Sequence, residues 1–300
     1  MEFSHLPVMP LETMSALNIK VGGQYIDGTV GGGGHARIIL DRIGPSGRLL
    51  GVDQDRDAIS YLEEVLKPAV STLTLYHGNY SRLDEIQVEL GWGAVDGILL
   101  DLGVSSYQLE ESKRGFSFLR DEILDMRMDH SSGEPASVLV NHLPEKELAD
   151  LIFRYGEERN SRRIARNIVR AREKKPIMTS LRLAEEVRRS FPRSGRRSRI
   201  NPATRTFQAL RLAVNRELDH LEKFLILAPK LIKVGGRLVV ISFHSLEDRL
   251  VKRALVKPKQ AREGEACLIS LYKKPIRPTA EEIAGNPRAR SAKLRVGQRV

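Results

Sequence analysis

The first hundred residues alternate short apolar runs with longer stretches of helical spacing, and this alternation limits the fold more than any other feature of the chain. The apolar runs predict four strands, and helical patterns at 36–43 and 58–66 separate the first three of them; the strands are residues 25–29, 49–53, 73–77 and 95–102. Strands joined by helix-length crossovers pair in parallel. The continuous apolar run at 97–100 suits a strand that is covered on both faces. We therefore predict an α/β fold with a parallel sheet.

The pattern changes after the fourth predicted strand. Residues 106–210 show helical stretches and polar linkers, without a second set of strands. One of these stretches, 159–172, places Ile164 and Ile168 on one helical face and a row of arginines on another. Beyond it we expect one long helix from after Pro202 to Leu221, and then three further strands, at 235–243, 266–272 and 292–296. The simplest organisation is a sheet domain in two parts, 1–105 and 211–300, interrupted by a helical domain at 106–210.

Charge is distributed unevenly along the 300 residues. Residues 1–150 carry 12 Lys and Arg against 24 Asp and Glu, whereas residues 151–210 carry 17 against 5 and residues 211–300 carry 20 against 9. An acidic half followed by an arginine-rich segment indicates a polyanionic partner, with nucleic acid as the first candidate. The alternative is a basic surface that is only solvated and binds nothing.

A glycine-rich loop follows the first predicted strand. Gly31, Gly33 and their two glycine neighbours form four successive glycines, which allow backbone angles and close ligand approach that a Cβ atom forbids. Asp53 ends the second strand 20 residues after Gly33, where this architecture uses a carboxylate to bind the ribose of an adenosine. Together with Ala36, the loop also satisfies the dinucleotide motif G-x-G-x-x-A. The acidic balance of residues 1–100, with 7 basic and 13 acidic residues, favours a cationic adenosine ligand over a dinucleotide.

Several other functions find little support in the sequence. The single cysteine, Cys267, excludes an intramolecular disulfide, and the seven histidines lack the HxxxH and HExxH spacings, so we expect no metal. We find no G-x-S-x-G motif for a hydrolase, and no run of eighteen apolar residues for a membrane span. A cytoplasmic protein is therefore expected. Residues 245–248 (SLED) have the form of a capping box that opens a helix after the strand ending at Phe243.

Motifs spread over nearly the whole chain resemble one known family, that of ribosomal RNA small subunit methyltransferase H, also called the MraW family. The matching segments are 25–35 (YIDGTVGGGGH), 96–106 (DGILLDLGVSS), 114–118 (RGFSF), 124–129 (LDMRMD), 155–159 (YGEER), 202–208 (PATRTFQ), 241–249 (ISFHSLEDR) and 286–291 (NPRARS). Together they are highly specific, although the segments around the glycine loop and the fourth strand would by themselves indicate only a methyltransferase.

The resemblance implies a fold, a reaction and a set of contacts. The fold would be the class I S-adenosylmethionine-dependent methyltransferase sheet, which is Rossmann-like, with an inserted helical domain that recognises substrate. The reaction would be N4-methylation of one cytidine in the decoding centre of 16S ribosomal RNA, with S-adenosyl-L-methionine as cofactor. The family's cofactor contacts map onto Gly33, Gly34, His35, Asp53, Tyr80, Asp101 and Gln108. Tyr80 would line the adenine.

Asp101, at the end of the fourth predicted strand, is the candidate catalytic residue. The lone pair of cytosine N4 is delocalised into the ring, so catalysis must align that nitrogen with the methyl group and provide an acceptor for its proton. Enzymes that methylate exocyclic amines commonly carry Asp, Asn or Ser followed by Pro-Pro and an aromatic residue here, whereas this chain has Asp-Leu-Gly-Val at 101–104. A role in cofactor positioning alone therefore stays open.

The expected partner is 16S rRNA, within the small ribosomal subunit or a late assembly intermediate. The segment 193–199 (RSGRRSR) predicts a phosphate-binding loop, with Arg196, Arg197 and Arg199 as RNA-binding candidates. Three alternatives remain: methylation of another RNA site, a non-catalytic ribosome-assembly factor with the same fold, and a nicotinamide-dependent oxidoreductase. No membrane contact is expected, and the sequence leaves a homodimer open.

Overall fold

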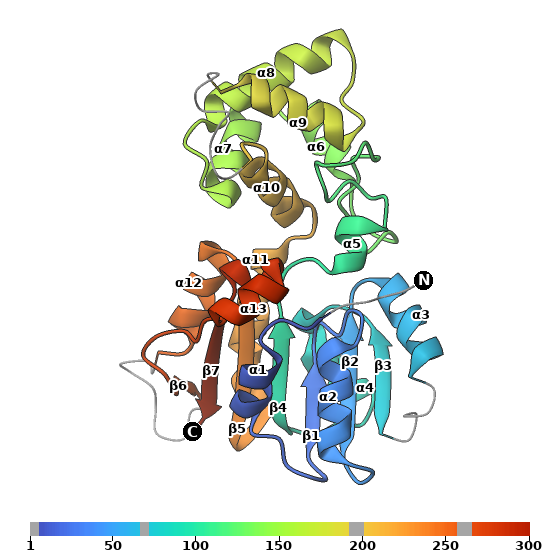
Figure 1. Cartoon of the computed structure of the whole chain (residues 1–300), viewed down its shortest axis with the longest axis vertical. Coiled ribbons are helices and arrows are strands. Elements are labelled where there is room, and N and C mark those ends of the chain that lie inside the picture. Colours follow the sequence, from blue (N-terminus) through green and yellow to red (C-terminus); the bar gives the residue numbers. More distant parts are fainter. Residues whose placement is uncertain (1–5, 67–71, 192–200, 257–265) are drawn as a thin grey trace. The chain divides into compact units, whose positions relative to one another are not determined.

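The computed structural model describes residues 6–66, 72–191, 201–256 and 266–300. These residues form two compact units, which we describe separately (Figure 1). The first unit combines Met1–Gly103 with Leu218–Val300, and the second is Val104–Glu217.

The first unit contains a seven-stranded sheet with the order β3-β2-β1-β4-β5-β7-β6. β1 to β5 pair in parallel, whereas β7 is antiparallel to both of its neighbours. The strands are β1 (Gln24–Asp27), β2 (Arg48–Asp53), β3 (Leu73–His77), β4 (Val95–Asp101), β5 (Ile232–Ser242), β6 (Leu268–Ser270) and β7 (Lys293–Arg299). This topology confirms the predicted α/β fold and its class I methyltransferase sheet.

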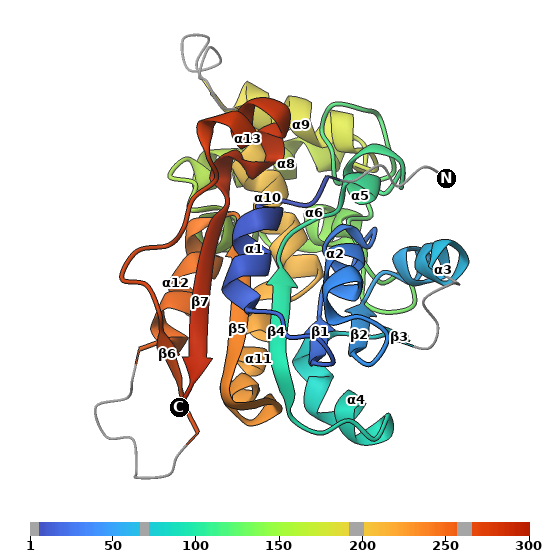
Figure 2. The same cartoon turned by 60° about the horizontal axis from the view of Figure 1, so that its bottom comes forward.

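Helices cover both faces of this sheet, which explains the continuous apolar runs in its strands (Figure 2). In β4, Ile98 and Leu100 face the core cluster that includes α4, α11 and α12, whereas Leu99 faces the cluster that includes α1, α2 and α3. The helices are α1 (Pro10–Leu17), α2 (Gly34–Ile43), α3 (Arg56–Val65), α4 (Leu83–Glu89), α11 (Glu217–Leu231), α12 (Ser245–Ala254) and α13 (Ala280–Gly285), with short 3-10 helices η2 (Tyr80–Arg82) and η4 (Pro287–Ser291).

The second unit is helical and has a hydrophobic core of its own. That core is built from residues between Phe116 and Leu210, including the buried face of α8 at Ile164 and Ile168. Polar side chains fix its irregular segments: Asn215, for example, accepts a hydrogen bond from the Met128 amide at 2.7 Å. The helices are α5 (Ser106–Glu110), α6 (Ala136–His142), α7 (Glu145–Gly156), α8 (Ser161–Lys174), α9 (Ser180–Arg189) and α10 (Thr204–Val214).

Three predicted details were wrong. The long helix expected after Pro202 is two helices, α10 and α11, because the chain turns at Arg216, which has a φ of +49°. The second unit therefore ends after Glu217 rather than after Leu210, whose side chain packs in that unit's core. The residue that caps α12 is His244 instead of Ser245, and its reciprocal partner is Glu247.

Candidate active site

The carboxyl ends of the parallel strands lie at one edge of the sheet, where open α/β sheets bind ligands. β1 lies between β2 and β4, so the strand order reverses beside β1, which is where open α/β sheets form a ligand-binding crevice at the carboxyl ends of their strands. Three aspartates end the three strands that meet there: Asp27 on β1, Asp53 on β2 and Asp101 on β4. The two predicted carboxylates, Asp53 and Asp101, therefore lie at the same edge of the sheet, and Asp27 lies there with them.

The glycine loop follows β1 and is tied to the neighbouring strands by its backbone. The Gly28 amide donates to the Leu99 carbonyl at 2.9 Å, and the Val30 amide donates to the Val52 carbonyl at 3.0 Å. Gly33 precedes α2 with a φ of +79°, and a Cβ there would lie 2.7 Å from the Leu62 side chain. Glycine is required at this position on both grounds.

Asp53 holds the glycine loop as well as ending its strand. Its carboxylate accepts hydrogen bonds from the amides of Gly31 and Asp55, each at 2.8 Å. Burial raises the pKa of Asp53 to about 6. A carboxylate has about four acceptor positions, so two backbone bonds leave room for the hydroxyls of a ribose.

Asp27 is the most deeply buried of the three aspartates, with 1% of its surface exposed. Its carboxylate accepts a hydrogen bond from the Thr29 amide at 3.2 Å. Burial raises the pKa of Asp27 to about 7, and the carboxylates of Asp101 and Asp53 act in the same direction. The edge therefore holds negative charge that is poorly solvated and that a cation would stabilise.

Asp101 and His35 form a pair in the crevice. His35, in the first turn of α2, is 5% exposed, and its Nε2 lies 3.5 Å from Oδ2 of Asp101. Both ring nitrogens of His35 and Oδ1 of Asp101 are buried without a hydrogen-bond partner among the described residues. Thr29 fixes the strand end, because its hydroxyl oxygen accepts the Asp101 amide hydrogen bond at 2.7 Å. Buried polar atoms without partners indicate that a ligand completes the site.

The segment after β3 lies at the same edge of the sheet. Tyr80, on η2, is 8% exposed and packs edge-on against Phe224, with ring centroids 5.7 Å apart. Beside it, Nδ2 of Asn79 donates to Oε1 of Gln54 at 2.8 Å and lies 3.0 Å from Nδ1 of His220. No local sequence pattern marks Asn79, His220 or Thr29, because each acts through a contact between elements far apart in the chain.

Not all predicted site residues belong to this unit. Gln108 lies in the second unit, where it is buried and completes the capping box of α5 with Ser105. Arg196, Arg197 and Arg199 lie outside the described residues. Among the described residues, no group of three His, Cys, Asp or Glu side chains is placed to hold a metal ion. None of the helices in that part of the chain is both long and apolar enough to cross a membrane.

The strand order with its antiparallel β7, together with the glycine loop after β1, defines the fold of the class I methyltransferases. The model of the MraW methylase family matches residues 2–300, and the chain belongs to this family.

Individual proteins resemble the chain over its whole length. It is 46% identical over 313 residues to a ribosomal RNA small subunit methyltransferase H of Geobacter sp. (strain M21), covering 100% of this chain and 99% of that protein. It is 47% identical over 315 residues to the protein of the same name from Magnetococcus marinus, covering 100% of both. A solved structure of an rRNA methylase from Streptococcus thermophilus aligns with a TM-score of 0.41 at 10% identity, over 97% of this chain and 95% of that one.

Proposed function

We propose that the chain transfers a methyl group from S-adenosylmethionine to N4 of one cytidine in the decoding centre of 16S ribosomal RNA. Membership of a methylase family and relatives named as ribosomal RNA small subunit methyltransferases support the class of reaction and of substrate. The observation that carries the proposal is the buried pair of His35 and Asp101, whose unsatisfied atoms lie at the carboxyl end of β4.

The residues around the crevice suit S-adenosylmethionine in hydrogen-bonding capacity and in charge. Asp53 has acceptor positions available for ribose hydroxyls beyond its two backbone hydrogen bonds. The three aspartates suit the sulfonium and ammonium groups of this cofactor better than the phosphates of a dinucleotide. Tyr80 and its neighbours would line the adenine, and Gly33, Gly34 and His35 would contact the cofactor from the loop. Gln108 is a further proposed contact.

Asp101 is placed for the proton chemistry of the transfer. The cofactor supplies an electrophilic methyl group on a positively charged sulfur. Oδ1 of Asp101 would accept a hydrogen bond from the N4 amino group, which localises the nitrogen lone pair and aligns it for in-line attack. The same carboxylate would take up the proton that N4 loses on accepting the methyl group, or would pass that proton to water. His35, 3.5 Å from Oδ2, would keep the carboxylate oriented.

The second unit would recognise the substrate. Residues 151–210, which fall within it, hold 17 basic and 5 acidic residues, a charge that attracts phosphates. A cytidine must leave its stack to reach the crevice, and contacts to neighbouring phosphates can compensate the few kcal/mol that this costs. We propose the second unit, with Arg196, Arg197 and Arg199, as the source of those contacts.

The test is to identify the modified nucleoside. Small ribosomal subunits and naked 16S rRNA from a strain lacking the gene are incubated with the purified protein and S-adenosylmethionine, and the nucleosides are analysed by mass spectrometry. We expect N4-methylated cytidine in treated samples and its absence from untreated ones. A methyl group on a different base or atom would refute the N4 assignment, and the absence of any methyl transfer to either substrate would refute the proposed activity.

A further inference from the structure

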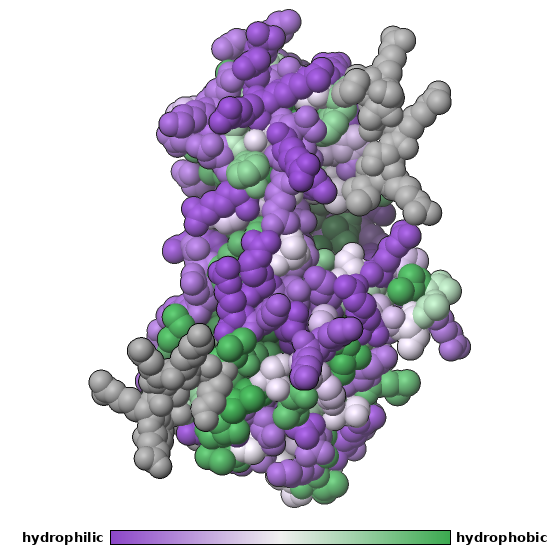
Figure 3. All heavy atoms as spheres, turned by 90° about the vertical axis from the view of Figure 1, so that its left-hand side faces the viewer, coloured by the Kyte–Doolittle hydropathy of each residue, from purple (hydrophilic) through white to green (hydrophobic). Residues whose placement is uncertain are grey.

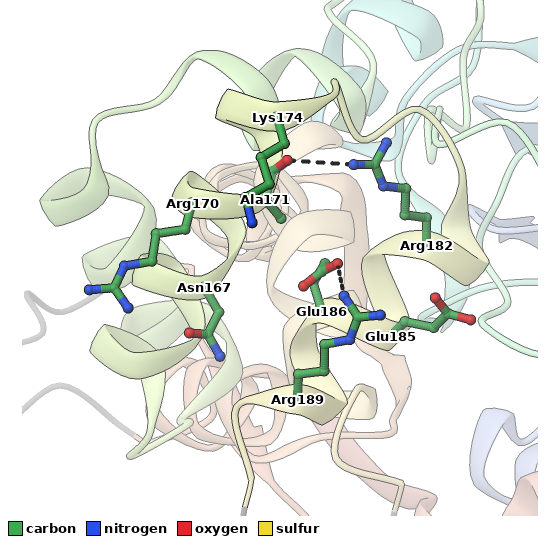
Figure 4. Close-up of a pocket in the computed structure, with 8 residues that line it drawn as sticks. All are labelled: Asn167, Arg170, Ala171, Lys174, Arg182, Glu185, Glu186 and Arg189. Carbon is green, nitrogen blue, oxygen red and sulfur yellow. Dashed lines mark hydrogen bonds and ion pairs between the residues drawn. The ribbon is translucent and has the colours of Figure 1, made fainter.

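A basic groove lies between α8 and α9 in the second unit. It has a volume of about 480 Å³ and is lined by four cations, two carboxylates, one amide and one alanine (Figure 4): Asn167, Arg170, Ala171, Lys174, Arg182, Glu185, Glu186 and Arg189. The surface of the second unit is hydrophilic over most of the face seen in Figure 3.

Hydrogen bonds at two places connect the walls of the groove. Near one end, Nδ2 of Asn167 on α8 donates to Oγ of Ser190 at 2.8 Å. Near the other, the guanidinium of Arg182 on α9 donates to the carbonyls of Lys175 and Pro176, which follow α8, at 2.7 and 2.6 Å. Arg182 is thus used to hold the end of α8. These contacts fix the two walls of the groove relative to each other.

The remaining cations differ in what they already contact. Arg189 donates to Oε1 of Glu186 at 2.6 Å, so these two charges largely cancel. Arg170 and Lys174 are exposed, lie one turn apart on the same face of α8, and make no ion pair within the described part of the chain. The dipole of α8 favours Lys174 in its last turn, but Arg170 lies a full turn earlier. A bound anion would reduce the repulsion between these two adjacent positive charges.

We infer that this groove binds the phosphodiester backbone of the RNA substrate, with Arg170 and Lys174 contacting the phosphates. Ala171 is the only apolar residue in its lining, whereas protein interfaces have an apolar centre and nucleic-acid interfaces are polar and positively charged. Glu185 is exposed in the groove and opposes such binding. The inference rests on the proposed function, because it assumes an RNA substrate.

The test measures binding of poly(U), an unstructured RNA, as a function of salt. In Arg170→Gln/Lys174→Gln, loss of two phosphate contacts should make the log-log salt slope shallower by roughly 1.4 and weaken binding about tenfold. The matched control is Lys252→Gln/Arg253→Gln, which also removes one lysine and one arginine, both exposed in the last turn of α12. It should retain the wild-type slope. S-adenosylmethionine affinity, measured by calorimetry, should be unchanged in both variants.

A third variant reverses the sign of the effect, which a folding defect cannot imitate. Glu185→Gln removes the exposed carboxylate and should tighten poly(U) binding several-fold. An unchanged slope in the double variant, or unchanged affinity in Glu185→Gln, would overturn the inference. Loss of poly-glutamate binding in the double variant, with RNA binding intact, would also overturn the inference, because the groove would then bind acidic peptides. Failure of the wild type to methylate ribosomal RNA would refute the proposed function, while the poly(U) measurements would still decide whether the groove binds phosphates.

Discussion

The two buried carboxyls in the crevice predict that cofactor binding depends strongly on pH. The pKa of Asp53 is raised to about 6 and that of Asp27 to about 7, so each carboxyl is protonated at mildly acidic pH in the free protein. A cationic cofactor favours the ionised forms and must displace those protons. Affinity for S-adenosylmethionine should therefore rise with pH through the range of these two pKa values.

The size of the effect follows from the ionised fractions. At pH 5 roughly one molecule in ten has Asp53 ionised and roughly one in a hundred has Asp27 ionised, whereas at pH 8 both are almost fully ionised. If binding requires both charges, the affinity should increase roughly 10³-fold between pH 5 and pH 8. Calorimetry in buffers of different ionisation enthalpy would measure both the affinity and the protons released.

Asp27→Asn provides the control. Its amide oxygen can still accept the Thr29 amide hydrogen bond, but the carboxyl with a pKa of about 7 is gone. The pH dependence should shrink to the roughly tenfold that Asp53 contributes. S-adenosylhomocysteine, which lacks the sulfonium charge, should show a weaker dependence with the unaltered protein. Cofactor affinity that is constant from pH 5 to pH 8 would refute the reasoning.

The pH dependence of stability without cofactor provides a second test of the raised pKa of Asp27. The folded-state pKa of Asp27, about 7, lies above its ordinary value of 3.8, so the folded protein binds the proton more tightly than the unfolded chain. The free energy of unfolding should therefore fall as pH rises from about 4 to about 7. In Asp27→Asn this decline should be smaller, as urea unfolding at several pH values would show.

Four further predictions concern single features. Asp53→Ala should weaken S-adenosylmethionine binding about tenfold or more while the fold is retained, since hydrogen bonds to a charged group are lost; wild-type affinity by calorimetry would contradict the ribose assignment. Asp101→Asn, measured in single turnover with saturating cofactor, should slow methylation roughly 10²-fold, and a near-normal rate would leave Asp101 as a cofactor contact only. Gly33→Ala should cost about 1–2 kcal/mol of stability from its positive φ alone, and should displace Leu62; an unchanged melting temperature would argue against this backbone conformation. Neutralising three arginines together should weaken RNA binding, with a salt slope shallower by up to about three contacts, and leave cofactor affinity unchanged; they are Arg196, Arg197 and Arg199.

The sequence predicted most of the sheet because local pattern and burial agree there. Residues 97–100 form a continuous apolar run and lie in β4, buried on both faces. The break between α10 and α11 had no comparable signal, because Arg216 adopts a positive φ without being glycine or asparagine. Its neighbour Asn215 is held by hydrogen bonds with the backbone of Met126 and Met128, which are long-range contacts that a local pattern does not contain.

The site was predictable in part for a similar reason. Asp53 could be placed from its spacing to the glycines, since the glycine loop follows β1 and Asp53 ends β2, the strand that pairs with β1. The contacts of Asp101 with Thr29 and His35 depend on β1 lying beside β4, and sequence order does not reveal that neighbour. Once the strand order is known, the register that pairs Asp27 with Leu99 brings these residues together.

The position of the second unit in the chain has a consequence for synthesis and folding. β4 and β5 are central neighbours in the sheet, yet the paired residues Leu99 and Val239 are 140 positions apart, since the whole of Val104–Glu217 is translated between them. The strands β1 to β4 can pair as they leave the ribosome, but the open edge of β4 must wait for β5. The second unit is contiguous and can fold during that interval. The nascent chain therefore carries an unpaired apolar strand edge for more than a hundred residues of translation, and the aggregation risk of this protein should be greatest at that stage.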